Sequence, residues 1–123
     1  MMSKNNSQSG FARSPCPVTS ALDLVGDKWT LVILRDLALG KSRYKQFQES
    51  PENIPSNILA DRLRRMEEHD LLVKTAYQQR PPRYEYRLTQ KGRDLIPLLH
   101  VLAKWSLKYR PGCWDPPERF WSL

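Results

Sequence analysis

The chain has 123 residues, enough for one domain with a single hydrophobic core and too few for two ordinary domains. Its 20 lysine and arginine residues exceed its 13 aspartate and glutamate residues and give a formal net charge of +7, a surplus that favours a polyanionic partner. The first ten residues lack a secretory signal, no apolar run could cross a membrane, and two cysteines are too few for a disulfide framework, so we expect a cytoplasmic protein with free thiols.

The N-terminal part predicts a tail and then two helices. Residues 1–15 are polar and poor in apolar side chains, so we expect a disordered tail before a domain that spans residues 16–109. Apolar residues recur at helical spacing over residues 18–25 and again over residues 28–39, and a glycine follows each segment as a stop signal.

Residues 55–68 give the clearest helical pattern of the chain, after a shorter predicted helix at residues 43–49. Pro55 suits a first helical position, because no amide hydrogen is needed there. One side of the helix carries Leu59, Leu63 and Met66, and the opposite side carries Asn57, Ala60, Asp61, Arg64 and Glu68. This helix therefore has one face to pack and one face to present to a partner.

Two strands and a basic connection are predicted next. Residues 71–77 are rich in strand-forming side chains, and residues 83–88 alternate apolar or aromatic with charged side chains. The connection at residues 78–82 is too long and too rich in proline for a two-residue hairpin. Residues 74–93 hold six basic residues and one acidic residue. We therefore expect a projecting basic β-ribbon.

The last predicted helix begins after Thr89, a suitable N-cap, and runs to about Tyr109, with Pro97 expected to kink or restart it. Its apolar stripe is wider than one packing partner can cover, so a second buried surface is implied. We expect a homodimer whose interface includes Leu22, Leu98, Val101, Leu102 and Trp105. Residues 110–123 show no period and are predicted to form a C-terminal tail.

The order of these elements predicts the fold class. Three compact helices followed by a two-stranded ribbon are typical of the winged helix-turn-helix arrangement. We therefore expect an α+β fold, mostly α: a winged helix-turn-helix domain with added N- and C-terminal dimerisation helices.

The polar face of the helix at residues 55–68 has the residue types that read base edges in a major groove. Asn57 can pair with adenine, Arg64 with guanine, and Asp61 can accept from the amino group of cytosine. Further contacts to bases, phosphates or a minor groove are predicted for Ser56, Arg62 and Arg65 in this helix, for Gln78, Gln79, Arg80 and Arg83 in the ribbon, and for Lys41, Ser42, Arg43 and Lys45 at a helix start. For the helix alone, a merely solvated face is the simpler interpretation, but the basic ribbon beside it favours double-stranded DNA.

Three stretches, CPVTSALDLVGDKWTLVILRDLALGKSRYKQF, LADRLRRMEEHDLL and YQQRPPRYEYRLTQKG, closely resemble the HxlR-type winged helix-turn-helix regulators. The resemblance runs from Cys16 to about Trp105. It implies a dimeric DNA-binding transcription factor, paired through its first and last helices. Two positions depart from the family pattern: Asp70 replaces a glycine, and Pro55 replaces a small hydroxyl residue.

The same resemblance places Cys16 at the family's N-terminal cysteine, which senses electrophiles or oxidants in some members. A thiol at a helix N-terminus can be reactive, because its pKa is lowered there. The alternative is a small residue buried at the dimer interface, in a protein that answers to another signal. A redox or small-molecule effector therefore stays open.

Other function classes fit the sequence less well. A metal site from Cys16, His69, His100 and Cys113 fails on spacing, and we expect neither a metal nor a cofactor. No glycine-rich loop, HExxH or GxSxG motif is present, so we expect no enzyme. The main alternative is a winged helix that binds protein, against which the local positive charge argues. We predict a transcriptional regulator that binds palindromic operator DNA as a homodimer.

Overall fold

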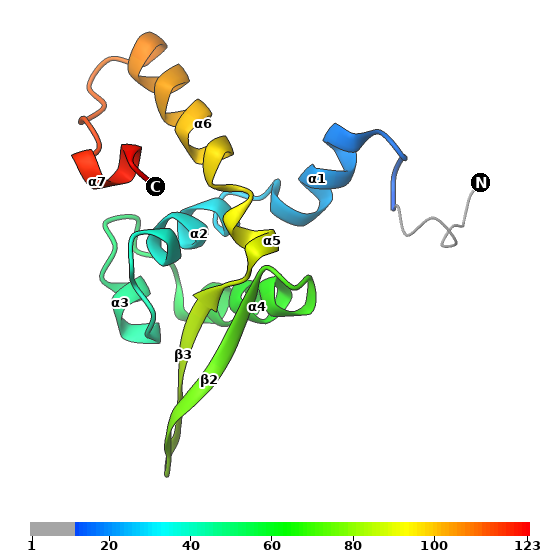
Figure 1. Ribbon diagram of the computed structural model, residues 1–123, viewed down its shortest axis with the longest axis vertical. Coiled ribbons are helices and arrows are strands. Elements are labelled where there is room, and N and C mark those ends of the chain that lie inside the picture. Colours follow the sequence, from blue (N-terminus) through cyan, green and yellow to red (C-terminus); the bar gives the residue numbers. More distant parts are fainter. Residues whose placement is uncertain (1–11) are drawn as a thin grey trace.

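The computed structural model describes residues 12–123, so most of the tail predicted for residues 1–15 lies outside the described residues. Along the chain it contains α1 (Pro17–Val25), α2 (Thr30–Ala38), α3 (Tyr44–Gln48), α4 (Ser56–Glu68), β2 (Leu72–Gln79), β3 (Pro82–Leu88), α5 (Gln90–Arg93), α6 (Ile96–Tyr109) and α7 (Glu118–Trp121). In Figure 1 a helical body stands at the centre, the β-ribbon projects from one end, and α1 and α6 extend from the other. The predicted winged helix-turn-helix fold, mostly α, is confirmed.

The core lies between α2, α3, α4 and the base of the ribbon. Its most deeply buried side chains are Ile33, Leu34, Phe47, Leu59, Leu63, Met66, Leu71 and Leu72. The three apolar residues predicted for the packing face of α4 are all among them. Burying such side chains stabilises the domain by roughly 1.5–3 kcal/mol each, and it orients the polar face of α4 outward.

Two helices begin later than the sequence pattern indicates. Helix α2 begins at Thr30, because the Asp27 carboxylate accepts hydrogen bonds from the amides of Trp29 (3.0 Å) and Thr30 (3.2 Å) and caps it. Helix α4 begins at Ser56, and the prediction that Pro55 is its first residue is wrong. Pro55 is the N-cap, with an extended ψ of 143°, so its fixed φ serves the turn that enters the helix.

The ribbon is a tight antiparallel hairpin. Its pairing runs from Leu72 opposite Leu88 to Gln79 opposite Pro82, which leaves only Arg80 and Pro81 in the connection. The predicted five-residue loop is therefore wrong. Polar side chains are compatible with an exposed strand, and a proline is tolerated at a strand's first residue. A bulge at Tyr77 adds one residue to β2 and increases the local twist.

The last predicted helix is two helices in the structure. The hydroxyl of Thr89 accepts a hydrogen bond from the amide of Gly92 (3.1 Å), which confirms the predicted N-cap of α5. Helix α5 ends at Arg93, and α6 begins at Ile96. Pro97 explains the break, since it has no amide hydrogen to donate to the Arg93 carbonyl and its ring would clash there. The prediction of a restart at Pro97 is confirmed.

The C-terminal segment, which has no period in the sequence, folds back on the body through α7. Phe120 is only 6% exposed. The carbonyl of Phe120 lies 2.7 Å from Nε2 of His100, and the guanidinium of Arg119 donates to the carbonyl of Leu39 (3.0 Å). His100, predicted on a helix surface, is therefore half-buried at this contact.

Within residues 12–123, no helix has both the length and the hydropathy that a membrane crossing requires. In the same part of the chain, no three histidine, cysteine or acidic side chains gather as a metal site. Cys16 and Cys113 are both exposed and free of disulfide bonds.

Candidate nucleic-acid interface

The outward face of α4 presents the residues predicted to read bases. Asn57 and Arg64 are exposed, and Asp61 is half-buried between them. Ser56 is exposed at the helix start, where its carbonyl accepts a hydrogen bond from the hydroxyl of Tyr44 (2.6 Å). That bond ties α3 to the first turn of α4, so the two helices of the helix-turn-helix unit are fixed at the end where bases would be read.

The charged side chains on this face form a network around Asp61. The Asp61 carboxylate accepts from Arg64 (2.7 Å) and Arg62 (2.6 Å), and Arg65 lies 3.8 Å away. Arg64 also donates to Glu68 (2.9 Å). These arginines, Arg64 first, lower the pKa of Asp61, so it stays ionised. Exposed ion pairs of this kind are weak, so Arg64 can exchange a carboxylate for a base edge at little cost.

Arg62, which was predicted to contact phosphate, is largely buried and paired within the molecule. Its Nε lies 2.7 Å from the Asp27 carboxylate, and its side chain is only 17% exposed. Although partial burial raises the pKa of Asp27, hydrogen bonds from Thr30, Arg62 and Trp29 lower it to about 2. Asp27 therefore both caps α2 and holds α4 through Arg62. Sequence reasoning missed this contact, since the two residues lie 35 positions apart.

The predicted clamp at the start of α3 is only partly open. The side-chain oxygen of Gln46 accepts from the amides of Ser42 (2.8 Å) and Arg43 (2.9 Å), so those donors are already used. Lys41 donates to the hydroxyl of Ser50 (2.7 Å) and is half-buried. Lys41 and Ser42, both predicted to contact phosphate, are thus engaged in hydrogen bonds within the protein. Among the four predicted residues, Arg43 and Lys45 are exposed.

Arg43 connects α3 to the ribbon. Its guanidinium lies 3.9 Å from the centre of the Tyr77 ring, and its Nε lies 3.2 Å from the Glu85 carboxylate. The amide of Tyr86 donates to the carbonyl of Ser42 (2.7 Å), so an isolated β-bridge between Arg43 and Glu85 joins the backbone before α3 to the hairpin. The contact fixes the angle of the ribbon against α3 and α4. Sequence analysis did not find Tyr77 or Glu85 as partners of Arg43.

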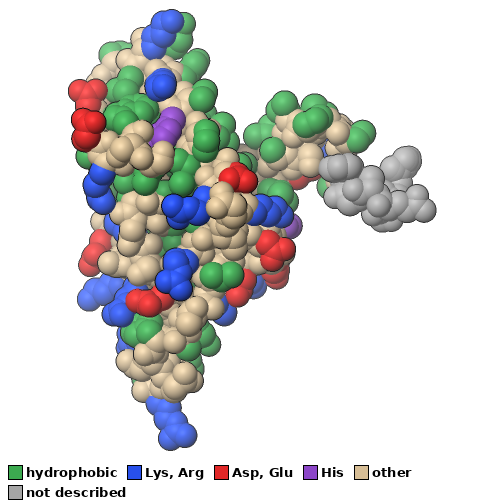
Figure 2. Space-filling view, in the orientation of Figure 1, with side chains coloured by type: hydrophobic (Ala, Val, Ile, Leu, Met, Phe, Trp, Pro, Cys, Tyr) green, Lys and Arg blue, Asp and Glu red, His purple; other side chains and the backbone are tan. Residues whose placement is uncertain are grey.

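The tip of the ribbon is basic and solvent-exposed. Arg80 lies in the turn, and Gln79 and Arg83 flank it as exposed residues. Gln78 is half-buried and donates to the carbonyl of Pro81 (3.1 Å), so it supports the turn. Figure 2 shows a lysine or arginine side chain at the far end of the ribbon. The tip can reach an anionic surface ahead of the body.

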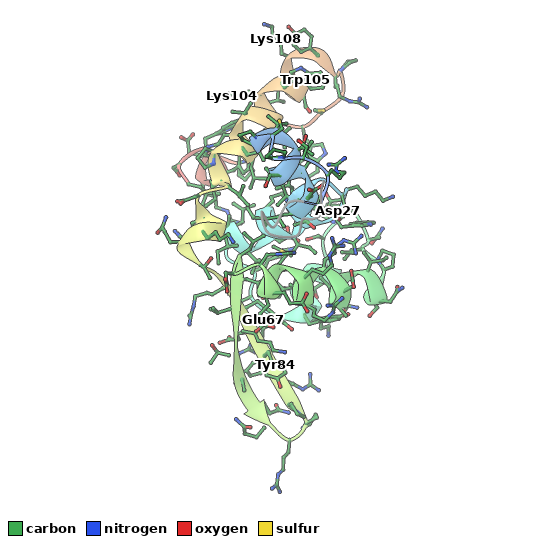
Figure 3. All side chains as sticks on the ribbon, turned by 90° about the vertical axis from the view of Figure 1, so that its right-hand side faces the viewer. Asp27, Glu67, Tyr84, Lys104, Trp105 and Lys108 are labelled. Carbon is green, nitrogen blue, oxygen red and sulfur yellow. The ribbon has the colours of Figure 1, made fainter. Side chains whose placement is uncertain are left out.

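A different surface lies at the other end of the molecule. All five residues predicted for the dimer interface are exposed in the single chain, from 36% to 63%: Leu22, Leu98, Val101, Leu102 and Trp105. Val18 and Tyr109, on the same two helices, are 68% and 60% exposed. Figure 3 places Trp105 and Tyr84 at opposite ends, so the apolar surface and the basic ribbon are well separated. We call the seven residues the apolar face.

Cys16 lies at the N-cap of α1 and is exposed. The pKa of its thiol is lowered, chiefly by the backbone amide of Thr19 and then by that of Val18. This shift favours the reactive thiolate. Cys113 belongs to the connection between α6 and α7, which Figure 1 shows on the opposite side of α6 from α1.

Comparisons with known proteins agree with this geometry. A family model described as HxlR-like helix-turn-helix matches residues 24–112. The HTH-type transcriptional regulator Mb3122 of Mycobacterium bovis is 42% identical over 100 residues, which are 81% of this chain and 63% of that protein, so the match spans less than two thirds of its length. The crystal structure of PA1607 is similar with a TM-score of 0.75 and 37% identity, over 90% of this chain and 76% of that one. The redox regulator HypR in its reduced form is similar with a TM-score of 0.70 and 32% identity, over 77% of this chain and 94% of that one.

Proposed function

The chain belongs to the HxlR-like helix-turn-helix family, and we propose that it regulates transcription by binding palindromic operator DNA as a homodimer. One observation carries the proposal: the exposed polar face of α4 and the basic ribbon lie at one end of the molecule, and the apolar face lies at the other. The first end suits a polyanionic duplex, and the second suits another copy of the chain.

Each protomer would read DNA with two elements. Helix α4 enters the major groove, where Asn57 and Arg64 reach base edges. The tip of the ribbon, with Arg80 and Arg83, contacts phosphates or the adjacent minor groove. The Asp27–Arg62 and Arg43–Glu85 ion pairs support this assignment, because they hold α4 and the ribbon at fixed angles to the body.

The apolar face supports the dimer. Exposed leucine, valine and tryptophan side chains on α1 and α6 favour burial against an equal surface, since each apolar Å² removed from water contributes about 25 cal/mol. A two-fold axis through this face would set the two α4 helices on the same side. Such dimers read half-sites about 34 Å apart, one turn of the duplex.

The proposal is tested by selecting bound fragments from a pool of random duplex DNA. We expect an enriched inverted repeat whose halves lie about one helical turn apart. Binding to it should weaken steeply as salt increases, because phosphate contacts release counterions. A pool that shows no enrichment, with affinity that salt leaves unchanged, would instead favour a winged helix that binds protein.

A second function of the same protein is proposed for Cys16: its oxidation state tunes DNA affinity. The exposed thiol and its lowered pKa support this role, as does the similarity to HypR, a redox regulator. If α1 lies at the dimer interface, a bulky adduct there would rotate one α4 relative to its twin. A tenfold change in occupancy needs only about 1.4 kcal/mol.

The test titrates DNA binding with a mild thiol oxidant, and separately with a quinone that forms a bulky thiol adduct, for the wild type and for Cys16→Ser. We expect the wild type to lose affinity and Cys16→Ser to keep it. Cys113→Ser is the matched control and should respond as the wild type does. Equal responses of all three proteins would leave Cys16 as a packing residue.

A further inference from the structure

A concave apolar cleft lies between the body, α6 and the C-terminal segment. The C-terminal segment folds back through α7 on the side of α6 away from α1 (Figure 1). Its volume is about 680 Å³, within the range of sites that hold small molecules. Its walls include Leu31 and Val32 of α2, Ala103 and Leu107 of α6, and Trp114 and Pro116 of the C-terminal segment. We call it the C-terminal cleft. None of its apolar lining belongs to the predicted DNA-reading elements α4, β2 and β3.

The polar end of the C-terminal cleft is internally neutralised. Arg35 donates to Glu52 (2.7 Å) and to Asp36 (2.8 Å), and Ser50 donates to Asp36 and accepts from Lys41. Two cations and two carboxylates therefore balance one another. Arg35 and the other hydrogen bonds keep the pKa of Glu52 low, so the pairing is that of charged groups. The end of the cleft has no surplus charge to offer a charged ligand.

The open shape of the C-terminal cleft is held by the return of the chain through α7. Buried Phe120, with its carbonyl 2.7 Å from His100 Nε2, anchors the segment to α6, and Arg119 anchors it to the Leu39 carbonyl (3.0 Å). Between α6 and these anchors the segment arches outward and presents Trp114, which is 74% exposed, as part of the wall. Phe120 and Leu39, which take part in these contacts, also line the cleft, so the anchoring contacts hold part of its wall in place.

We propose that the C-terminal cleft binds a small, uncharged aromatic molecule. The aliphatic floor removes apolar surface from water, the exposed indole of Trp114 offers an aromatic surface for stacking, and the balanced polar end rejects a net charge. A second copy of the chain fits less well, because the side chains that project furthest from α6, among them Val101 and Trp105, lie outside the concave wall. Leu102 alone is shared between the cleft and the apolar face.

The C-terminal cleft is also lined by the segment that leads into α4, the helix proposed to read bases. Pro51 and Glu52 line it, and α4 begins four residues later, at Ser56. A bound molecule would contact both this segment and α6. The inference that this molecule alters DNA affinity rests on the proposed function. The inference that the cleft binds such a molecule does not.

The test uses N-phenyl-1-naphthylamine, an uncharged aromatic probe whose fluorescence increases in apolar sites, without DNA. We expect saturable binding at one site per chain, and at least about tenfold weaker binding of its sulfonated analogue 8-anilinonaphthalene-1-sulfonate. Trp114→Ala should weaken binding of the uncharged probe about tenfold, which corresponds to about 1.4 kcal/mol. Ser106→Phe, which fills the cleft from α6, should abolish it.

The matched control is Trp105→Ala, which removes an exposed tryptophan of α6 that does not line the cleft. It should bind the probe as the wild type does. Loss of binding in Trp105→Ala with retention in Trp114→Ala would place the probe on the apolar face and overturn the proposal. No saturable binding, or preference for the sulfonated analogue, would also overturn it. Because no DNA is present, such a failure leaves the proposed function as it stands.

Discussion

The two ends of the molecule expose opposite kinds of side chain: charged ones on α4 and the ribbon, and apolar ones on α1 and α6. On α4 and the ribbon, exposed charges pair with one another, as Arg64 does with Asp61 and Glu68, and remain well solvated. On α1 and α6, exposed apolar side chains such as Val101 and Trp105 are hydrated unfavourably, and pairing with one another does not offset that cost. The charged surface of α4 and the ribbon is well solvated without a partner and can bind one reversibly. The apolar surface of α1 and α6 favours lasting burial against a partner. In the proposed function, therefore, the dimer persists and DNA binding is the reversible event.

The largest effect is expected from placing the same charge at both ends. Val101→Asp puts a carboxylate into the proposed dimer interface and should weaken the dimer at least about a hundredfold, or about 2.7 kcal/mol. Val73→Asp, on the exposed side of β2, should leave the dimer intact. Analytical ultracentrifugation across protein concentrations measures both. Equal masses for the two variants would erase the contrast between the ends.

A smaller effect is expected where α4 reads bases. Arg64→Ala should cost about 1–3 kcal/mol of DNA affinity and relax the preference at one base pair. Fluorescence anisotropy with a set of single-base operator variants measures it. Arg110→Ala, an exposed arginine beyond α6, is the control and should change neither affinity nor preference. An Arg64→Ala protein with unaltered base preference would move base reading elsewhere.

The Asp27–Arg62 ion pair, which holds α4 against the body, should contribute to the stability of the fold rather than to DNA binding. Asp27→Ala removes the cap of α2 and the partner of Arg62, and we expect a loss of about 1–2 kcal/mol in the free energy of unfolding. Urea denaturation measures it. Asp23→Ala, which breaks only the surface pair with Arg13, should cost less than about 0.5 kcal/mol. Similar losses in both variants would remove the special role of Asp27.

The same pair predicts a pH dependence with a defined sign. The folded pKa of Asp27 is about 2, below its ordinary value of 3.8. The stability contributed by the ionised carboxylate is therefore fully present above about pH 4 and is lost as pH falls towards 2. Urea midpoints at pH 5 and pH 3 should differ more for the wild type than for Asp27→Ala. An equal drop in both proteins would assign the acid sensitivity to other groups.

The smallest effect is expected at the tip of the ribbon. Arg80→Ala should weaken binding to all duplexes about evenly and reduce the slope of log affinity against log salt by about 1, as for the loss of one phosphate contact. Anisotropy titrations at several salt concentrations, on specific and on random duplexes, measure the slope. A loss confined to the specific duplex would show that the tip reads sequence.

The sequence predicted the elements that repeat a pattern and missed those that depend on distant partners. The faces of α4 and α6 and the cap at Thr89 follow from spacing along the chain. The role of Arg62 depends on Asp27, which lies 35 positions away, and no local pattern shows that pair. The four residues of α7 are too few for a helical period, although burial of Phe120 fixes them.

The hairpin shows a different limit. Polar and proline residues predict a loop at residues 78–82, yet Gln78, Gln79 and Pro82 pair as strand residues, because an exposed ribbon needs no apolar face. Asp70 occupies the left-handed region with φ of 60°, a conformation that favours glycine, so the backbone turn tolerates the larger side chain. The conformational preference of each residue sets the free-energy cost of its backbone conformation at these positions, and the packing around it decides which conformation is adopted.

The central claim is that the apolar faces of two copies pack together and so link two DNA-reading ends in one dimer. The most direct test compares the wild type with Val101→Asp on the selected inverted repeat and on a duplex that holds one half-site. We predict that the wild type binds the full repeat at least about a hundredfold more tightly than the half-site, whereas Val101→Asp binds both duplexes alike and weakly. A Val101→Asp protein that keeps the wild-type preference for the full repeat would contradict the account.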